Sequence, residues 1–597
     1  MVDVKIDGRV GLLVLSLVLV FGGGALGYWG HTAGGSVSVQ DVQFEGTNGT
    51  TMSGHLYVPE GVSAKNPAPG VLAVHGYINT KQVQAPFATE YARRGYVVLA
   101  LDQTGHGGSE PPAFANAFGG PDGLAYLQSR SLVQNDSIAL SGHSMGGWAI
   151  TAAAAVHPQK YDAVIYQGSG PGPIPGFPIP NATAPNGSAT FPRNVGVVFA
   201  EYDEFHWLMW GAPSADSAAV RSATKTKAVF GTESAVEEGR VYGSVESGSA
   251  RRLTTPATTH PGTHLSGAAV ADSVEWLQRT VPTETDLSPT NQVWYWKEVG
   301  TLLALFGAVL FVFPAGSLLL DRDPLSAAVD TVPDAVTERG GWWYANAAVA
   351  AIVPALTYYP AMILGDQVLS ANAIFPQTIT NGVAIWALVN ALLTIAFVGI
   401  LHVRRDTEGD ALAQLGLGTG ESGGAVARAL GVAVAVVGAV YLSLVVVDAL
   451  FDVDYRFWFV ALKLLQPWQV GAYLVYLPVF GAFFVALGVL LHGRLRTPAT
   501  TTSLRRAMAT NTVVVVGGFV LLVAVQYVPL LLGHALAVPP LALYAIVSLS
   551  FLPVLTAAAL ISTYFYHRTG RVWTGAFVNA VLITWFLVAS TATQAPI

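Results

Sequence analysis

Residues 136–150 read DSIALSGHSMGGWAI and decide the fold of the first half of this 597-residue chain. The apolar run at 138–140 predicts a buried strand, and the small residues after 146 predict the start of a helix. Between them, the G-x-S-x-G spacing places Ser144 at the apex of a sharp turn, where only glycine fits two residues to either side. Such a turn exposes the Ser144 hydroxyl and directs the Met145 backbone N–H toward a developing oxyanion. The stretch therefore predicts a nucleophilic serine.

Short apolar runs before and after this stretch predict further buried strands, at 70–74, 96–101, 163–167, 195–200 and 251–254. Helical stretches alternate with them, near 85–94, 122–130 and 268–278. This alternation predicts a mostly parallel sheet covered on both faces. Ahead of it, residues 37–44 and 54–58 alternate as paired strands do, with Asn48-Gly49 as their turn. Residues 168–193 are rich in proline and glycine and predict a loop or small lid.

Composition divides the chain in two. Hydrophobic residues make up 52%, charged residues 11%, and the mean hydropathy is +0.48, as in membrane proteins. Residues 31–296 nevertheless hold 14 Lys and Arg against 21 Asp and Glu, whereas the rest holds 16 of each and is mostly apolar. The absence of cysteine excludes disulfides and thiolate chemistry. No basic patch indicates nucleic acid.

The first 30 residues predict a membrane anchor. Lys5 and Arg9 precede an apolar stretch at 10–29 that is long enough to cross a bilayer as a helix. A cleaved signal peptide is the alternative, because the basic start and short apolar core also suit one. The length of the stretch and the lack of a clear cleavage site favour the anchor.

Several motifs of the first half occur in order: VLAVHGY at 71–77, GYVVLALDQTGHGGS at 95–109, DGLAYLQSR at 122–130 and IALSGHSMGG at 138–147. With these motifs, residues 41–274 resemble the α/β-hydrolases, near the dienelactone-hydrolase and acyl-peptidase-like branch. The resemblance implies a triad in the chain order Ser, acid, His.

The resemblance implies Ser144 as nucleophile, Asp203 as orienting acid and His264 as general base. An imidazole removes the serine proton, and a carboxylate fixes the imidazole tautomer. Glu201 and Glu204 are the alternative acids, and His260 is the alternative base. His264 is preferred because the catalytic histidine of the family directly precedes the last helix. The long separation between Asp203 and His264 indicates an insertion within 224–248.

The second oxyanion donor is expected after the His75-Gly76 strand, so we assign it to the Tyr77 backbone N–H, beside that of Met145. His75, His106 and His143 adjoin glycines and are interpreted as structural, so no metal ligand and no cofactor are predicted. The aromatic stretch at 205–210 reads as a loop. Its Trp207 and Trp210 either line an acyl pocket or pack a lid.

Residues 297–597 predict a transmembrane domain. Hydropathy gives eight further spans, near 298–320, 342–365, 382–403, 427–451, 469–492, 509–533, 541–565 and 572–591. Residues 457–468 are expected to lie along the membrane interface. With a cytoplasmic N-terminus, the inner flanks hold thirteen basic residues: Lys5, Arg9, Arg322, Arg339, Arg404, Arg405, Arg428, Arg494, Arg496, Arg505, Arg506, Arg568 and Arg571. The outer flanks hold three: Lys297, Arg456 and Lys463.

This asymmetry places residues 31–296 outside the cytoplasm. The sequence thus predicts three parts: an anchor (1–30), an extracytoplasmic α/β-hydrolase domain (31–296) and an all-α membrane domain (297–597). The expected function is a membrane-anchored serine hydrolase that cleaves small-molecule or lipid-borne carboxylic esters, with the lipid bilayer as its surroundings. The alternatives are a peptidase, a thioesterase or an acyltransferase with the same triad, and a non-catalytic sensor or binding head on a transport or signalling domain.

Overall fold

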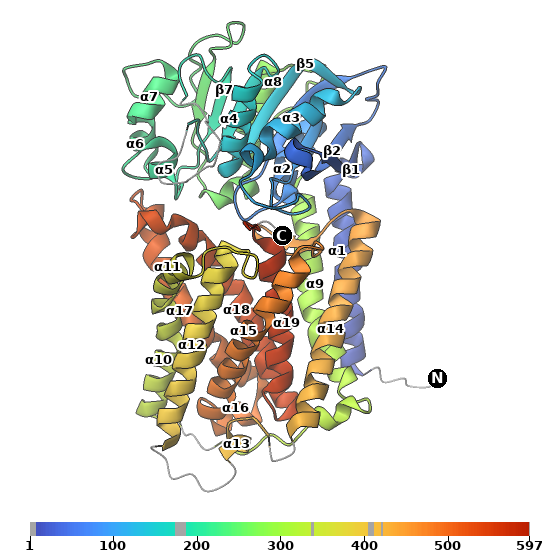
Figure 1. Ribbon diagram of the computed structural model, residues 1–597, viewed down its shortest axis with the longest axis vertical. Helices are drawn as coiled ribbons and strands as arrows, with labels where there is room; N and C mark the ends of the chain where they lie inside the picture. The colour runs from blue at the N-terminus through green and yellow to red at the C-terminus, as the bar shows by residue number, and fades with distance from the viewer. Residues whose placement is uncertain (1–6, 173–186, 336–338, 404–410, 419–421, 596–597) are drawn as a thin grey trace.

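A computed structural model describes residues 7–172, 187–335, 339–403, 411–418 and 422–595. The α/β region stacks on one end of a bundle of long helices, and Figure 1 shows the two parts one above the other. We call the bundle the helical region, the end that meets the α/β region its near end, and the opposite end its far end. Residues 173–186 of the expected loop at 168–193 lie outside the described residues.

One eight-stranded sheet forms the centre of the α/β region, in the order β1-β2-β4-β3-β5-β6-β7-β8. Its strands are β1 (Val37–Glu45), β2 (Thr51–Pro59), β3 (Ala68–Val74), β4 (Val97–Leu101), β5 (Val133–His143), β6 (Ala163–Gln167), β7 (Val195–Val198) and β8 (Arg251–Thr254). β1, β2 and β4 pair antiparallel, and from β4 to β8 every pair is parallel. The predicted α/β sheet is confirmed. Its parallel strands all end at one edge.

Helices cover both faces of the sheet. Leu72, Leu99 and Leu140 point to the face covered by α3 (Gly120–Ser129) and α4 (Met145–Val156). Val71 and Val98 point to the opposite face, covered by α2 (Ala85–Ala92) and α8 (Gly267–Thr280). This alternation is the period of two that strands impose on their side chains. It explains why the buried strands are apolar without interruption.

Three short helices follow β7 along the chain, before β8: α5 (His206–Trp210), α6 (Ser217–Ser222) and α7 (Thr224–Phe230). The prediction of a loop at 205–210 was therefore wrong, since α5 is one helical turn that ends at Gly211 with a φ of 69°. The turn between β1 and β2 falls where Asn48-Gly49 predicted it, with Asn48 at a φ of 60°.

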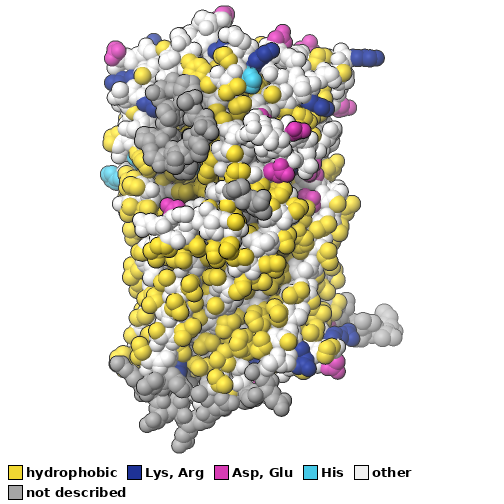
Figure 2. Space-filling view, viewed as in Figure 1, with side chains coloured by type: hydrophobic (Ala, Val, Ile, Leu, Met, Phe, Trp, Pro, Cys, Tyr) yellow, Lys and Arg dark blue, Asp and Glu magenta, His cyan; other side chains and the backbone are white. Residues whose placement is uncertain are grey.

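The helical region consists of α1 (Gly8–His31), α9 (Tyr295–Leu319), α10 (Gly341–Leu356), α11 (Tyr358–Val368), α12 (Thr378–Val403), α13 (Ala411–Gln414), α14 (Ser422–Phe451), α15 (Gln469–Val489), α16 (Pro498–Thr502), α17 (Leu504–Leu531), α18 (Ala542–Thr569) and α19 (Trp573–Ser590). Among the described residues, nine helical segments are long and apolar enough to cross a membrane, and α10 and α11 together form one of them. Each of the nine predicted spans falls on one of these segments. Figure 2 shows hydrophobic side chains over the visible face of the bundle.

Helix α1 packs along α9 at unusually close range. A Cβ atom at Gly23 would lie 2.6 Å from the Ala304 backbone nitrogen, and one at Gly300 would lie 2.2 Å from the Gly27 backbone nitrogen. Glycines of both helices thus allow the two backbones to touch, as small residues do between membrane helices. Since α1 precedes the α/β region and α9 follows it, these paired helices tether that region at both of its ends.

The near end of the bundle carries a small hairpin, β9 (Tyr455–Phe457) and β10 (Val460–Leu462). Residues 457–468, expected to lie along the membrane interface, begin in this hairpin, which contacts the α/β region. Arg456 donates from Nη2 to Thr80 Oγ1 (3.2 Å), and Trp458 donates from Nε1 to the Pro261 carbonyl (2.5 Å). The two regions therefore share a specific polar interface.

Two adjacent glycines of α1 test the close packing on α9. The substitution Gly23→Val forces methyl groups into the α9 backbone and is expected to destabilise the protein by about 1–3 kcal/mol or more. The matched control Gly22→Val adds the same side chain where nothing lies within 4 Å. Thermal unfolding of the purified protein in detergent measures both variants. Equal melting temperatures for the two would contradict the observed packing.

Candidate active site

Ser144 sits on a strained turn between β5 and α4. Its backbone has a φ of 52° and a ψ of −121°, a conformation that non-glycine residues rarely adopt. The Ser144 N–H donates to the Gln167 carbonyl (2.9 Å), and the Ser144 carbonyl accepts from the Gly147 N–H (2.9 Å). Neighbouring backbone thus holds the turn on both sides, as a nucleophile elbow requires.

The glycines around Ser144 are required by close contacts. A Cβ atom at Gly142 would lie 2.4 Å from the Gly146 carbonyl oxygen, and one at Gly146 would lie 2.2 Å from the Val74 carbonyl oxygen. A Cβ atom at Gly76 would lie 3.0 Å from the Ser144 Cβ. The steric reason that predicted the elbow from its spacing therefore holds, and the loop after β3 approaches the serine directly.

Asp203 and His260 form a pair beside the elbow. Asp203 follows β7, His260 follows β8, and both strands end at the same edge of the sheet as β5. His260 donates from Nδ1 to Asp203 Oδ2 over 2.8 Å, and Asp203 Oδ1 accepts from the Phe205 N–H (2.8 Å). Both side chains are buried, Asp203 completely. The carboxylate therefore fixes the tautomer of this imidazole.

The structure does not bring His264, the predicted general base, to the predicted acid. His264 lies in the 3-10 turn Pro261–Leu265, and neither of its ring nitrogens has a hydrogen-bond partner. Its ring packs against that of His143, with 4.1 Å between centroids. The turn keeps both histidines beside His143, but only His260 faces Asp203. The geometry thus favours the alternative base, His260, over His264.

Burial controls the protonation of this imidazole. Loss of solvation lowers the pKa of His260 from 6.5 to about 3. At neutral pH His260 is therefore neutral, the form in which Nε2 accepts a proton.

Glu204, one of the alternative acids, supports His260 from behind. Glu204 Oε2 accepts from the His260 backbone N–H (2.8 Å), and Glu204 Oε1 is hydrogen-bonded to the Tyr527 hydroxyl of α17 (2.9 Å). Burial and the neighbouring Asp203 carboxylate raise the pKa of Glu204 from 4.5 to about 8. A protonated Glu204 therefore connects the helical region to the loop of the imidazole. The other alternative acid, Glu201, donates its backbone N–H to the Pro256 carbonyl (2.9 Å).

The two residues predicted to supply the oxyanion donors lie at the same cavity as Ser144. Tyr77 and Met145 both line it, and Met145 is the first residue of α4. The Tyr77 hydroxyl accepts a hydrogen bond from Gln594 Nε2 (2.6 Å), so the chain beyond α19 holds the Tyr77 side chain. Thr593 adds two backbone bonds to the α/β region, from its N–H to the Gly105 carbonyl (2.8 Å) and from the Ala113 N–H to its carbonyl (2.7 Å).

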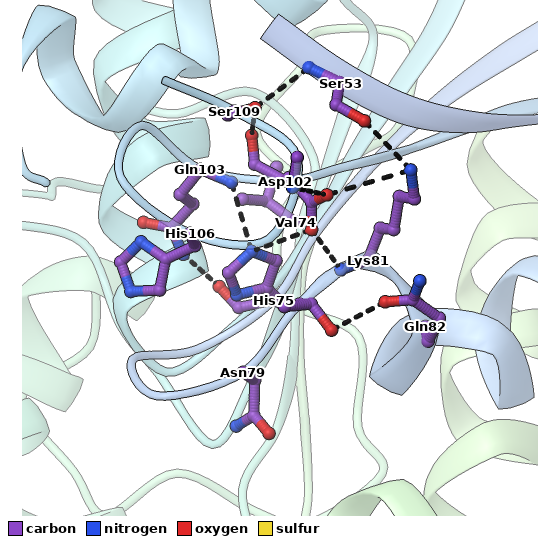
Figure 3. Close-up of polar contacts among 12 residues, drawn as sticks. Ser53, Val74, His75, Asn79, Lys81, Gln82, Asp102, Gln103, His106 and Ser109 are labelled. Atoms are coloured by element: carbon purple, nitrogen blue, oxygen red, sulfur yellow. Dashed lines mark hydrogen bonds and ion pairs between the residues drawn. The ribbon is translucent and has the colours of Figure 1, made fainter. Parts of the chain in front are cut away.

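A polar network anchors the loop after β3 (Figure 3). His75 Nε2 accepts from the Gln103 N–H (3.1 Å), and the Lys81 N–H donates to Asp102 Oδ1 (2.7 Å). The Lys81 ammonium donates to Ser53 Oγ (2.9 Å). These buried contacts tie the ends of β3 and β4 and the edge of β2 together, and so fix the loop that carries Tyr77.

The other histidines near the site bind the backbone. His75 Nδ1 is 2.7 Å from the carbonyl of the next residue, and His106 Nδ1 is 3.0 Å from the carbonyl two residues before it. His143 Nε2 is 3.1 Å from the His260 carbonyl. Each N–H donates to a carbonyl, so these rings hold turns.

Within the described part of the chain, one group of side chains could hold a metal ion by its geometry: Asp41, His55 and Asp452. The Lys81 ammonium lies 2.6 Å from Asp41 Oδ1, and His55 Nε2 lies 3.2 Å from the same oxygen. Asp41 is therefore already paired with a cation. We interpret the cluster as part of the polar interface between the α/β region and α14.

One side of the cavity was not predicted from the sequence. Trp458 and Phe459 of the β9–β10 turn line it, together with Pro540, Leu543, Tyr544 and Ile546 at the start of α18. Leu543, Tyr544 and Ile546 belong to a predicted span whose hydropathy is that of any membrane helix, so no local signal marks them as part of a site. Only the docking of the two regions brings them to Ser144.

Comparison with known proteins agrees with this fold. Residues 65–195 match a family described as "Serine aminopeptidase, S33". No curated protein matches the chain. The mostly parallel eight-stranded sheet with helices on both faces is that of an α/β-hydrolase fold, and Ser144 lies within the matched residues. Together with the family match, this geometry supports a hydrolase.

The solved structures that match the chain are distant from it. The thioesterase domain from the curacin biosynthetic pathway is 16% identical, with a TM-score of 0.27, and the match covers 40% of this chain and 99% of that one. Acetyl xylan esterase 1 from Thermoanaerobacterium sp. is 18% identical, with a TM-score of 0.20 and coverages of 22% and 50%. Epoxide hydrolase A from Mycobacterium thermoresistibile is 22% identical, with a TM-score of 0.19 and coverages of 23% and 41%. The match thus spans less than half of that epoxide hydrolase, and likenesses of this size say nothing about activity.

The raised pKa of Glu204 makes stability depend on pH. Between pH 4.5 and about 8 the folded chain holds a proton on Glu204 that the unfolded chain releases. The free energy of unfolding therefore falls as pH rises through this window, by at most about 1.4 kcal/mol for each pH unit. The variant Glu204→Gln preserves both hydrogen bonds and cannot titrate.

Thermal unfolding in detergent at pH 5 and pH 8 tests this. We expect the wild type to lose more stability than Glu204→Gln between the two values, since all other titrating groups are shared. The same loss in both proteins would show that Glu204 is ionised in the fold.

Proposed function

We propose that the protein is a membrane-anchored serine hydrolase that cleaves carboxylic esters through an acyl-enzyme on Ser144. One observation carries this proposal: His260, which is paired with Asp203, lines the same cavity as a serine on a sharp, strained turn. A strained serine beside an acid-oriented, neutral imidazole is the arrangement that acyl transfer needs.

The first half-reaction forms the acyl-enzyme. As Ser144 Oγ attacks the ester carbonyl carbon, its proton passes to His260 Nε2, and the carbonyl oxygen becomes an oxyanion. We assign the backbone N–H groups of Tyr77 and Met145 as the hydrogen-bond donors to this oxyanion. The carbon–oxygen bond to the alcohol then breaks, and His260 gives its proton to the leaving oxygen. Asp203 stabilises the imidazolium that forms in between.

The second half-reaction hydrolyses the acyl-enzyme and regenerates free Ser144. Water gives a proton to His260 Nε2 and attacks the acyl carbon, a second oxyanion forms, and the bond to Ser144 breaks as its Oγ regains the proton. The products are a carboxylic acid and free Ser144. Thioester or peptide cleavage would use the same steps. The predominantly apolar cavity favours esters, because a peptide would bury more unpaired polar groups.

We also propose an orientation in the membrane. Arg9 and Arg568 both pair with Asp321 at the far end of the bundle, from which the α/β region is absent. The positive-inside rule assigns that end to the cytoplasm. Ser144 then faces the extracytoplasmic side.

Labelling with a fluorophosphonate probe tests the nucleophile and its base. We expect the wild type to label, Ser144→Ala not to label, and His260→Ala to label at least a thousandfold more slowly, because its serine loses the general base. His264→Ala is the matched control, and we expect its labelling rate to fall less than tenfold. Labelling that survives in His260→Ala but is lost in His264→Ala would restore His264 as the base. If folded wild type fails to label, the hydrolase proposal is wrong.

A membrane-impermeant probe on intact cells tests the orientation. Labelling of intact cells is expected, and labelling only after lysis would reverse the topology.

The lowered pKa of His260 predicts the acid side of the pH profile. The value of kcat/KM for a soluble ester reports the free enzyme's essential base. Since His260 is neutral well below pH 6.5, we expect kcat/KM to stay level from pH 7 down to pH 5. A fall with an apparent pKa near 6.5 would instead indicate a solvated base.

A further inference from the structure

The helical region supplies one side of the wall around Ser144, six of the 22 residues that line the cavity. The cavity measures about 280 Å³. From the α/β region it is lined by the elbow, His260 and α5, including Trp207. From the helical region it is lined by the β9–β10 turn and by the first two turns of α18. The bundle is therefore part of the binding site as well as its support.

The chemistry of this wall selects an apolar ligand. Trp458, Phe459, Leu543 and Ile546 present carbon surface, and none of the residues that line the cavity is Lys, Arg, Asp or Glu. A charged group would lose its hydration there and find no oppositely charged side chain in return. An aliphatic chain has no polar hydration to lose, and its transfer from water into the cavity is favourable in free energy.

The cavity reaches the surface at the outer end of α18. Pro540, in the short turn η8 (Pro539–Leu541), lines the cavity and is also exposed. On the same connection Val538 is 41% exposed, and Leu531 and Leu532 at the end of α17 are 50% and 70% exposed. Apolar surface thus continues from the lip of the cavity onto the outside of the bundle, at the level where the membrane-capable helices end.

We propose that the substrates are esters with a long aliphatic chain, drawn from the bilayer past η8, and that α18 and the β9–β10 turn are the acyl-chain wall. This inference rests on the proposed hydrolase function. Leu543 is the specificity-determining residue that the geometry marks most clearly, because its half-buried side chain enters the cavity from the helical side. Each buried methylene should raise kcat/KM about fourfold until the wall is reached.

Chain-length selectivity tests the wall. The full-length protein in nanodiscs is assayed with 4-nitrophenyl acetate and octanoate below their micelle concentrations, after fluorophosphonate titration of active sites. We expect the wild type to prefer octanoate. In Leu543→Trp, which fills the cavity, the octanoate-to-acetate ratio of kcat/KM should fall at least tenfold. Leu474→Trp, the same change at a 61% exposed position near the outer end of α15, should keep the wild-type ratio.

A ratio in Leu543→Trp equal to that of the wild type would overturn the proposal, as would a wild type that prefers acetate. If Leu543→Trp shows no titratable sites, Leu543→Ala replaces it. That variant enlarges the cavity and should shift the optimum to longer chains, and an unchanged optimum overturns the proposal. A wild type that neither labels nor cleaves any ester refutes the hydrolase function itself, which is a different result.

Surface dilution tests the source of the chain. A fluorogenic palmitate ester is placed in proteoliposomes, and more lipid is added at a constant total amount of ester. If the ester enters from the bilayer, the rate follows its mole fraction in the lipid and falls with dilution. A rate that follows bulk concentration and stays constant would overturn entry from the membrane.

Discussion

The strained backbone of Ser144 is the constraint on which the rest of the site depends. A positive φ at a serine persists only where its surroundings hold it, and here β5, α4 and the carbonyl of Gln167 do so. The parallel sheet supplies this rigidity, because β5 is flanked by β3 and β6 and is buried on both faces. Once the elbow is fixed, the neighbouring strand ends bring Asp203 and His260 to it.

The interface with the helical region extends this rigidity outward. Tyr527 reaches Glu204 behind the imidazole, Gln594 reaches Tyr77, and Trp458 reaches the carbonyl of Pro261, the residue after His260. Each contact falls on a loop that carries a site residue. The loops at the sheet edge are thus held from both sides, by the strands beneath them and by the bundle across the cavity.

Local sequence signals were enough to predict the elbow, the parallel strands and the apolar helices, because each follows from the spacing of hydrophobic residues or from the shape of one turn. The choice between His260 and His264 could not be made from local signals. They lie one turn apart, both beside His143, and only the long-range position of Asp203 separates them. The aromatic turn α5 was misread because a single helical turn is too short to show a helical period. The cavity wall that includes Leu543 could not be predicted, because the sequence around Leu543 is that of an ordinary membrane helix.

The order of the residues along the chain has a consequence for biosynthesis. Ser144, Asp203 and His260 are all translated long before α18 and Gln594. A nascent chain can therefore complete its nucleophile elbow while the apolar wall is still missing and Tyr77 is not yet held. The hydrolase acquires its full binding site only when α18 has inserted and residue 594 has docked. Maturation of the enzyme is thereby coupled to correct insertion of the helix bundle.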